Sequence, residues 1–249
     1  MKLTILGRWA PFAPAGGAGT GYLVEAGGAN LLLDGGPGTL SRLQELLDPA
    51  RLTAVFVSHL HEDHIADLHS LQYAIWVAQR AGRCTGPLPI YAPLEPAGPR
   101  QWLEPLIPGT VEVRPLPVDE GLQIGELSLR WHPTDHPRPC WAVRIDGPTG
   151  SLVYTGDTGT AIDLAPFAAG VDLLLTEATY TQATGAERAT YGHQTGAEAG
   201  ELAVRAGVGK LLLTHLRPGI DPAEVLAEAR AFCPVAELVE ERESYTAKA

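Results

Sequence analysis

Three histidines and two acidic residues fall within six consecutive positions, and this cluster limits what the chain can fold into more than any other feature. Residues 58–64 read Ser-His-Leu-His-Glu-Asp-His and follow a predicted strand at residues 53–57. Side chains two positions apart on an extended backbone project to the same side, so His59 and His61 can bind one metal ion together. Asp63 and His64, at the start of a predicted helix, can turn toward a second ion. The segment therefore predicts a metal site.

The ligand types narrow the choice of metal. Imidazole nitrogens and a carboxylate suit Zn²⁺, and they also suit Mn²⁺ or Fe²⁺. The alternative interpretation is a polar helix N-terminus that holds three histidines by chance. The chain has only 8 His in 249 residues, so chance rarely places three of them within six positions. We therefore expect two divalent ions, with zinc as the expected metal.

The hydrophobic pattern predicts strands in two groups with helices outside both. Short apolar runs indicate strands at residues 2–6, 22–25, 30–33, 53–57, 89–91, 111–114, 127–131, 141–145, 152–155, 171–176 and 210–213. Helical spacing indicates helices at 40–47, 65–80, 195–206 and 222–232, and Thr195 with Glu198 forms a capping box. This arrangement is typical of a layered α/β sandwich. No repeat or linker divides the chain, so we predict one domain over residues 1–249.

The apolar runs, the N-terminus and the cysteines indicate a cytoplasmic protein without disulfides. The longest apolar runs are far shorter than the roughly 20 residues of a membrane span, so no membrane association is expected. The N-terminus has the pattern of a strand and not of a signal peptide, which predicts a cytoplasmic protein. Cys84, Cys140 and Cys233 are odd in number and widely spaced, so they predict reduced thiols and neither disulfides nor a cysteine-rich zinc site.

The charge balance disfavours long nucleic acid as a partner. The formal net charge is −11, with 29 Asp and Glu against 18 Lys and Arg, and the arginines form no run. Proteins that bind nucleic acid through its phosphates usually carry a basic face. A small-molecule substrate is the expected partner.

Further motifs follow in a fixed order. His136 lies in Thr-Asp-His-Pro before a predicted strand, Asp157 follows the strand at 152–155, and His215 follows the strand at 210–213. With the histidine-rich turn, this order resembles the metallo-β-lactamase superfamily, whose fold is a four-layer αββα sandwich around a metal site. The resemblance spans nearly the whole chain and implies a set of ligands for each ion: His59, His61 and His136 for one, Asp63, His64 and His215 for the other, and Asp157 shared by both.

Two more segments are similar to the ribonuclease Z-like branch of that superfamily. Thr-Glu-Ala-Thr-Tyr at 176–180 and Gly-His-Gln-Thr at 192–195 resemble its paired glutamate and histidine motifs. The resemblance implies that His193 assists the leaving group and that Glu177 orients it, and such a pair suits general acid catalysis at neutral pH. The alternative is a turn histidine and a surface acid. Gln194 stands where the branch has a small hydroxyl residue.

The chain departs from ribonuclease Z in one respect that concerns the substrate. Ribonuclease Z carries a long tRNA-grasping arm between its third and fourth metal motifs. Here His136 and Asp157 are only 21 positions apart, which leaves room for one hairpin. The missing arm and the acidic balance argue against tRNA processing and favour a small substrate.

Other residues near the motifs have open roles. His132 is the rival of His136 for the third ligand position, and His136 is favoured because it lies just before the next strand. His69 fits the surface or the surroundings of the site, and Asp67 is either a partner of a ligand histidine or a solvated helix acid. The loop Gly7–Gly21 could cover the site or be an ordinary surface loop.

These features predict a dinuclear metal-dependent phosphodiesterase. Two ions would share a hydroxide that attacks phosphorus, with Asp63 among the catalytic groups and His193, held by Glu177, protonating the departing oxygen. An alternative keeps the metals but cleaves a carboxylic ester, thioester, lactone or sulfate ester, because fold does not decide the substrate. A third is a non-catalytic metal-binding protein. The resemblance also implies a homodimer.

Overall fold

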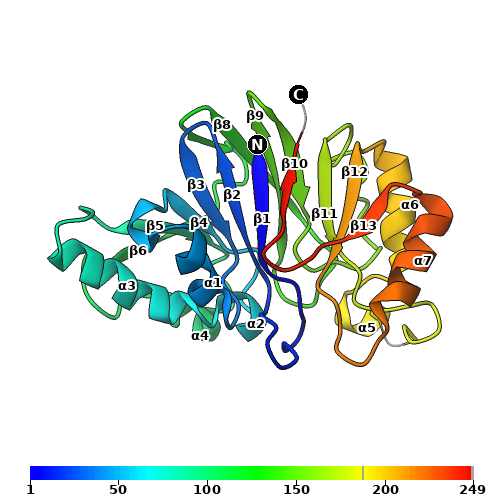
Figure 1. The fold of residues 1–249 in the computed structure, drawn as a ribbon, viewed down its shortest axis with the longest axis horizontal. Helices are drawn as coiled ribbons and strands as arrows, with labels where there is room; N and C mark the ends of the chain where they lie inside the picture. The colour runs from blue at the N-terminus through cyan, green and yellow to red at the C-terminus, as the bar shows by residue number, and fades with distance from the viewer. Residues whose placement is uncertain (187, 248–249) are drawn as a thin grey trace.

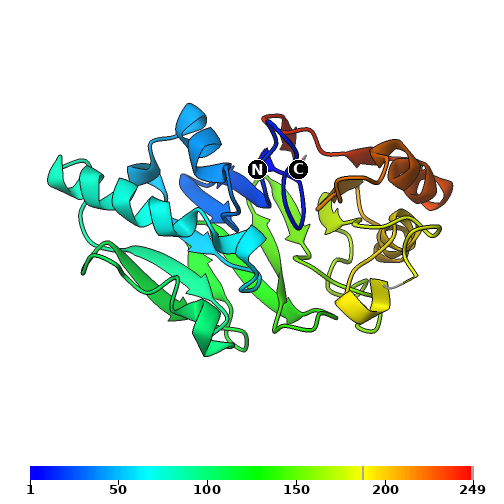
Figure 2. The same cartoon turned by 90° about the horizontal axis from the view of Figure 1, so that it is seen from below.

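Two seven-stranded sheets form the centre of the molecule within the described residues, 1–186 and 188–247 (Figure 1). In this computed structural model the first sheet holds the early strands and the second holds the later ones. Helices cover the outer face of each sheet, and Figure 2 shows these two helical groups on opposite sides of the strands. The chain therefore has the αββα sandwich that its motifs predicted.

Neighbouring strands within each sheet follow one another along the chain, except that the last strand returns to the first sheet and pairs with the first strand. The first sheet has the order β14 (Ser244–Thr246), β1 (Lys2–Gly7), β2 (Gly21–Ala26), β3 (Ala29–Leu33), β4 (Ala54–Phe56), β5 (Leu88–Ala92), β6 (Val111–Pro115). The second has the order β13 (Ala236–Leu238), β12 (Lys210–Thr214), β11 (Leu173–Glu177), β10 (Gly150–Tyr154), β9 (Trp141–Gly147), β8 (Leu127–Pro133), β7 (Leu122–Ile124).

The helices divide between the two outer layers. On the side of the first sheet lie α1 (Thr39–Leu46), α2 (Glu62–Ile65), α3 (Leu68–Arg80), α4 (Ala97–Arg100) and a 3₁₀ turn (Pro49–Arg51) (Figure 1). On the other side lie α5 (Arg188–Tyr191), α6 (Gly196–Ala206) and α7 (Pro222–Phe232). Thr195 and Glu198 form the predicted reciprocal capping box at the start of α6.

Alternation along the strands divides the apolar side chains between three cores. In β11, Leu173 and Leu175 face the core between the sheets, whereas Leu174 faces the core beneath α6 and α7. In β3, Leu31 faces the central core, whereas Leu32 faces the core beneath α1 and α3. Successive side chains of a strand point to opposite faces, so strands buried on both faces must be apolar throughout.

The helix predicted at residues 65–80 is broken into two pieces. α2 ends at Ile65 and α3 starts at Leu68, because the backbone of Gly35 intervenes. The Gly35 N–H donates to the carbonyl of His64 at 2.6 Å, and the Asp67 N–H donates to the carbonyl of Gly35 at 2.9 Å. These bonds replace helical ones and tie the histidine-rich turn to the end of β3. Three short strands, β7, β13 and β14, were not predicted from the sequence.

Several strands end at one edge of the second sheet. β10, β11 and β12 are parallel, and β8 points the same way because β9 is antiparallel to both β8 and β10. Their carboxyl ends therefore meet at one edge, where residues that follow different strands come together.

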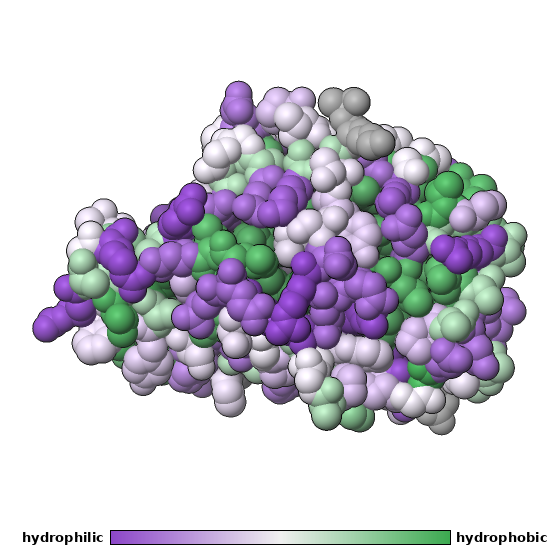
Figure 3. Space-filling view, in the orientation of Figure 1, coloured by the Kyte–Doolittle hydropathy of each residue, from purple (hydrophilic) through white to green (hydrophobic). Residues whose placement is uncertain are grey.

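The face drawn in Figure 3 is largely hydrophilic, and the three cysteines are unpaired. Figure 3 shows hydrophilic side chains over much of one face, with smaller apolar patches between them. Cys84, Cys140 and Cys233 are free thiols. None of the helices in the described ranges has the length and apolar character needed to cross a membrane.

Candidate metal centre and active site

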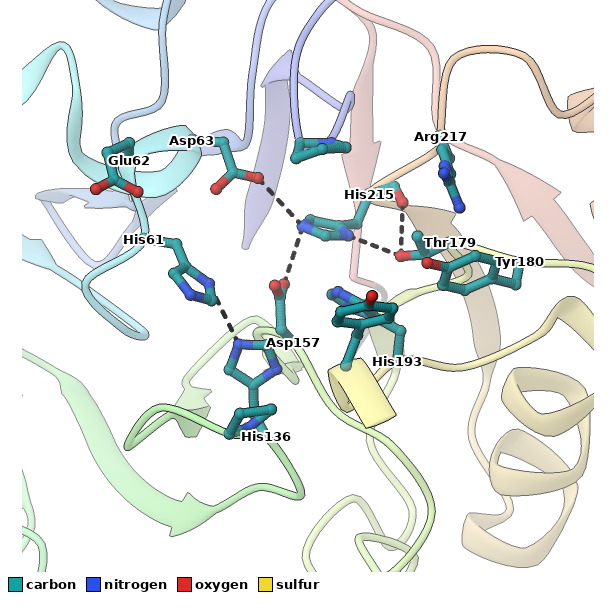
Figure 4. Close-up of a pocket in the computed structure, with 13 residues that line it drawn as sticks. His61, Glu62, Asp63, His136, Asp157, Thr179, Tyr180, His193, His215 and Arg217 are labelled. Atoms are coloured by element: carbon teal, nitrogen blue, oxygen red, sulfur yellow. Dashed lines mark hydrogen bonds and ion pairs between the residues drawn. The ribbon is translucent and has the colours of Figure 1, made fainter. Parts of the chain in front are cut away.

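The histidine-rich turn lies just beyond the end of β4. His59 is fully buried, and its Nε2 lies 2.9 Å from Nδ1 of His61. The two imidazoles point to the same spot because the backbone between them is extended up to the start of α2. His136, in the loop that joins β8 to β9, places its Nε2 3.3 Å from the same Nδ1 of His61 (Figure 4). Residues separated by 75 positions thus form the first cluster.

A second cluster forms on the other side of Asp157. His64 Nε2 lies 3.2 Å from Nε2 of His215, which follows β12 and has a φ of 56°. Asp63 Oδ2 lies 3.7 Å from His64 Nε2 and 3.6 Å from His215 Nε2. The left-handed backbone at His215 is uncommon outside glycine and turns the ring into the cleft.

Asp157 lies between the two clusters. Its Oδ2 is 3.4 Å from His59 Nε2, while its Oδ1 is 3.1 Å from His215 Nε2 and 3.4 Å from His64 Nε2. The ligand atoms of His59, His61, His136 and Asp157 lie close enough together to hold one ion, and so do those of Asp63, His64 and His215. The structure thus brings together all seven predicted ligand residues, with one carboxylate oxygen facing each cluster.

The close approaches between nitrogen and oxygen atoms in the clusters are suited to a bound cation. Asp157 Oδ1 is buried and has no hydrogen bond from the residues that the structure describes. Three pairs of imidazole nitrogens lie 2.9–3.3 Å apart. Two of these pairs share Nδ1 of His61, which carries a single N–H or a single lone pair, so one of its two neighbouring nitrogens lacks a well-directed hydrogen bond. A positive ion among these atoms would satisfy the nitrogen lone pairs and the unpartnered oxygen.

The protonation of the first cluster suits metal binding. Burial, reinforced by the charge of His136, lowers the pKa of His61 to about 4, and burial also lowers the pKa values of His59 and His136. These rings are therefore neutral at pH 7, as metal ligation requires. Burial opposes the ionisation of Asp157, but the surrounding histidines hold its pKa well below the ordinary value.

The pKa of His64 is shifted in the opposite direction. Burial would lower its pKa, but three carboxylates, led by Asp157 and followed by Asp63 and Asp34, raise it well above the ordinary value. Three anions around one imidazole create a strong demand for positive charge. A proton meets that demand in the metal-free protein, and a divalent cation can replace it.

Asp34 organises the ligands from behind and was missed by the sequence analysis. Its Oδ2 lies 2.8 Å from Nδ1 of His64 and accepts hydrogen bonds from Ser58 Oγ and Tyr154 OH at 2.7 and 2.6 Å. Its Oδ1 accepts from the Ser58 N–H at 2.7 Å. A carboxylate behind a ligand histidine fixes the tautomer and the orientation of the ring. Asp34 directly follows β3, 30 positions before His64 in the sequence.

The other residues with open roles lie outside the clusters. The Asp67 carboxylate accepts from the backbone N–H of Leu40 at 2.9 Å, so it caps α1 and binds no histidine. His69 packs against Trp102, and His132 packs against Phe167, and neither belongs to the ligand clusters. His136 is therefore the histidine of that segment which reaches the clusters.

Beside the clusters, His193, which is half-buried, pairs with Glu177, which is fully buried. His193 Nδ1 lies 2.9 Å from Glu177 Oε1, which also accepts from the Thr158 N–H at 2.7 Å. Glu177 Oε2 accepts from Thr179 Oγ1 at 2.6 Å and from the Gln194 N–H at 3.2 Å. Burial alone would lower the pKa of His193, but the Glu177 carboxylate outweighs it and raises the pKa to about 9.

Neighbouring side chains connect the His193–Glu177 pair to the second ligand cluster. Thr179 Oγ1 lies 2.8 Å from Nδ1 of His215, so Glu177 is connected to both His193 and His215. Gln194 is buried and bonds to the carbonyl of Gly159 at 3.2 Å, which explains how an amide occupies that position. His193 also lies close enough to Asp157 and His215 for the three to share an ion.

A cleft of about 520 Å³ lies above the clusters (Figure 4). Its walls come from both halves of the chain and include the segment between β1 and β2. That segment is fixed to the end of β12, because the Leu216 N–H donates to Arg8 O at 2.8 Å and the Ala10 N–H donates to Leu216 O at 3.1 Å. The loop Gly7–Gly21 therefore contributes to one wall of the cleft. The lining residues are Pro11, His61, Glu62, Asp63, His136, Pro137, Asp157, Thr179, Tyr180, Tyr191, His193, His215 and Arg217.

The fold and this cleft define the class of the protein. Residues 29–216 match the family described as the beta-lactamase superfamily domain. The chain belongs to the metallo-β-lactamase superfamily, as its motifs predicted.

The relatives include metal-dependent hydrolases. The chain is 35% identical over 216 residues to the probable metallo-hydrolase YhfI of Bacillus subtilis, covering 87% of each protein. The crystal structure of YhfI matches with a TM-score of 0.91 at 31% identity over 98% of each chain. Ribonuclease Z of Mycolicibacterium gilvum is 33% identical over 256 residues, covering 90% of this chain and 87% of the relative.

A more distant structure shares the fold alone. The crystal structure of a diphosphatase from the PhnP family matches with a TM-score of 0.77 at 17% identity, covering 100% of this chain and 99% of the other. The family assignment and the relatives of 33–35% identity, rather than this distant structure, make the chain a metallo-hydrolase of the superfamily. Its cluster of histidines and aspartates is suited to divalent metal.

Proposed function

We propose that this protein is a phosphodiesterase that depends on two divalent ions, zinc in particular, and acts on a small substrate. His59, His61 and His136 would hold one ion, Asp63, His64 and His215 the other, and Asp157 both. The placement of Asp157 supports this division, because its two oxygens face different clusters. When bound, such a pair of ions supplies Lewis-acid activation of water and of the phosphoryl oxygens.

The observation that carries the proposed reaction is the His193–Glu177 pair. A pKa of about 9 keeps His193 protonated at neutral pH, so it can donate a proton to the oxygen that leaves phosphorus. Glu177 is fully buried and bound by two backbone N–H groups and a hydroxyl, so it holds the imidazole in one orientation. An alkoxide leaving group needs such an acid.

The hairpin between the third and fourth motifs supports a small substrate. β9 and β10 are joined by only Pro148 and Thr149, so the chain has no inserted arm there. The cleft of about 520 Å³ is of the size that accommodates small molecules.

A panel of substrates tests the proposal on the metal-loaded protein. Bis(p-nitrophenyl) phosphate, p-nitrophenyl acetate, a lactone and a cephalosporin would be compared by kcat/KM. We expect the phosphodiester to be hydrolysed fastest. Faster turnover of an ester or lactone would replace phosphodiesterase by carboxylic ester hydrolase, and no turnover with both ions bound would indicate a metal-binding protein without catalysis.

A further inference from the structure

Two charged side chains of the cleft take no part in the ligand clusters or in the His193–Glu177 pair. These are Glu62 and Arg217, and Figure 4 shows them on opposite sides of Asp157. Both are exposed. Among the described residues that line the cleft, Arg217 is the only lysine or arginine. The mouth of the cleft is therefore negative on the side of α2 and positive on the side that follows β12.

Arg217 is held in place by its neighbours. It lies two positions after His215, and the intervening Leu216 is fixed to the segment after β1 by backbone hydrogen bonds through its N–H and its carbonyl. The guanidinium stacks on the ring of Tyr180, with 5.1 Å between its Cζ and the ring centroid. A stacked guanidinium keeps its N–H groups at the edge, where they can donate to a ligand.

Arg217 also differs from most arginines of the chain. Arg8 pairs with Glu240, Arg42 with Glu241 and other arginines with nearby acids. Over the ranges 1–186 and 188–247, Arg217 forms no ion pair and donates no side-chain hydrogen bond to the protein. In a chain with a net charge of −11, a cation without a partner at the wall of a cleft is a candidate to bind an anion.

We propose that Arg217, stacked on Tyr180, binds a second anionic group of the substrate, a phosphate monoester or a carboxylate carried by the leaving half. The proposal rests on the proposed function and specifies its substrate class. Arg217 lies on the same side of Asp157 as His193, the acid for the leaving oxygen (Figure 4). The carboxylate of Glu62 repels an anion on the other half. The planar fork of the guanidinium matches either oxyanion with two parallel hydrogen bonds.

Three matched phosphodiesters test this assignment. Methyl phenyl phosphate has a neutral leaving half, and its 3-carboxyphenyl and 3-phosphonooxyphenyl analogues add a carboxylate or a phosphate. The release of the phenol would be measured with the metal-loaded wild type and with R217Q. The control is R80Q, which removes the same charge from an exposed arginine stacked on Trp76, away from the cleft.

We expect the wild type to prefer at least one of the two anionic substrates over the neutral one. R217Q should reduce that preference by roughly 10- to 100-fold, the usual value of a bidentate contact to an anion, mainly through KM. R80Q should retain it, and R217K should restore only part of it, because an ammonium lacks the fork. A wild type without preference, or an R217Q variant that keeps it, would overturn the assignment.

A binding experiment separates this proposal from the proposed reaction. Phenylphosphonate and 3-phosphonobenzoate cannot be hydrolysed as phosphodiesters, and their affinities for the metal-loaded protein can be measured by calorimetry. We expect tighter binding of 3-phosphonobenzoate in the wild type, lost in R217Q and kept in R80Q. That result would support the role of Arg217 even if no phosphodiester were cleaved. Equal affinities in the wild type would contradict it.

Discussion

The two halves of the metal centre are built differently. The N-terminal half supplies four of the seven candidate ligands, His59, His61, Asp63 and His64, from one turn of six residues. The C-terminal half supplies the other three, each from a different segment at one edge of the second sheet, and they span 79 positions. The turn positions its ligands through local backbone geometry, whereas the other half depends on the register of the five strands from β8 to β12.

The two halves also differ in the charged side chains, other than ligands, that they contribute around the metal clusters. The strands that deliver the C-terminal ligands also deliver Glu177 at the end of β11 and Arg217 just after β12. The turn contributes one further charged group to the cleft, Glu62. We infer that the turn serves mainly the metals, and that the second sheet also determines which bond is cleaved and in which substrate.

Removal of the Asp157 carboxylate, which lies between the two ligand clusters, should have the largest effect on metal binding and turnover. In D157A, the histidines of both clusters lose their common anion, so we expect loss of metal and of all measurable turnover. Metal content by mass spectrometry and hydrolysis of bis(p-nitrophenyl) phosphate would be measured, with circular dichroism to verify the fold. Retention of two ions per chain would show that the halves bind metal independently.

Loss of the imidazole of His193 should affect the reaction and spare the metals. H193A removes the acid but none of the seven ligands, so we expect both ions to stay bound while the rate falls roughly 10²–10⁴-fold. The matched control is H132A, since His132 packs against Phe167 outside the clusters. Full activity of metal-loaded H193A would remove His193 from the mechanism, and loss of metal would make it a ligand.

Substitution of Asp34, which lies behind the histidine-rich turn, should lower the affinity for metal more than the turnover of the metal-loaded protein. In D34N, an amide NH₂ replaces the oxygen that His64, Ser58 Oγ and Tyr154 OH all approach, and we expect metal affinity to fall roughly 10- to 100-fold. Competition with a chelator measures this affinity. D67N provides the comparison, because Asp67 caps α1 and contacts no ligand. Equal affinities in the two variants would contradict the role of Asp34.

The smallest expected effect is a shift in pH dependence. Glu177 raises the pKa of His193 to about 9, so the acid is protonated below that pH and is lost as pH rises through it. In E177Q the pKa should fall, and the alkaline limb of kcat should move to lower pH. A pH profile of kcat, with metal content measured in parallel, would show this. An unchanged alkaline limb in E177Q would assign that limb to another group.

The sequence indicated the fold well wherever patterns were local. Apolar runs such as Leu31–Leu33 predicted strands, and the Thr195–Glu198 capping box predicted the start of α6. It failed where distant backbone intervened, as at Asp67, where Gly35 interrupts the expected helix. It also missed the edge strands β13 and β14, which are three residues long and carry too few side chains to show a period.

For the site, the spacing of His59 to His64 by itself indicated the candidate ligands of the turn, because an extended backbone sets their directions. His136, Asp157 and His215 were indicated by the resemblance of their segments to the superfamily motifs. Only the tertiary structure decided what lies around them. Asp34 reaches His64 across 30 positions, and Arg217 reaches Tyr180 across 37. Neither contact has a local pattern, because each depends on which strands lie side by side. The candidate ligands lie in short segments that can be recognised in the sequence, whereas their meeting at one place and the charge in the cleft follow from the packing of the two sheets.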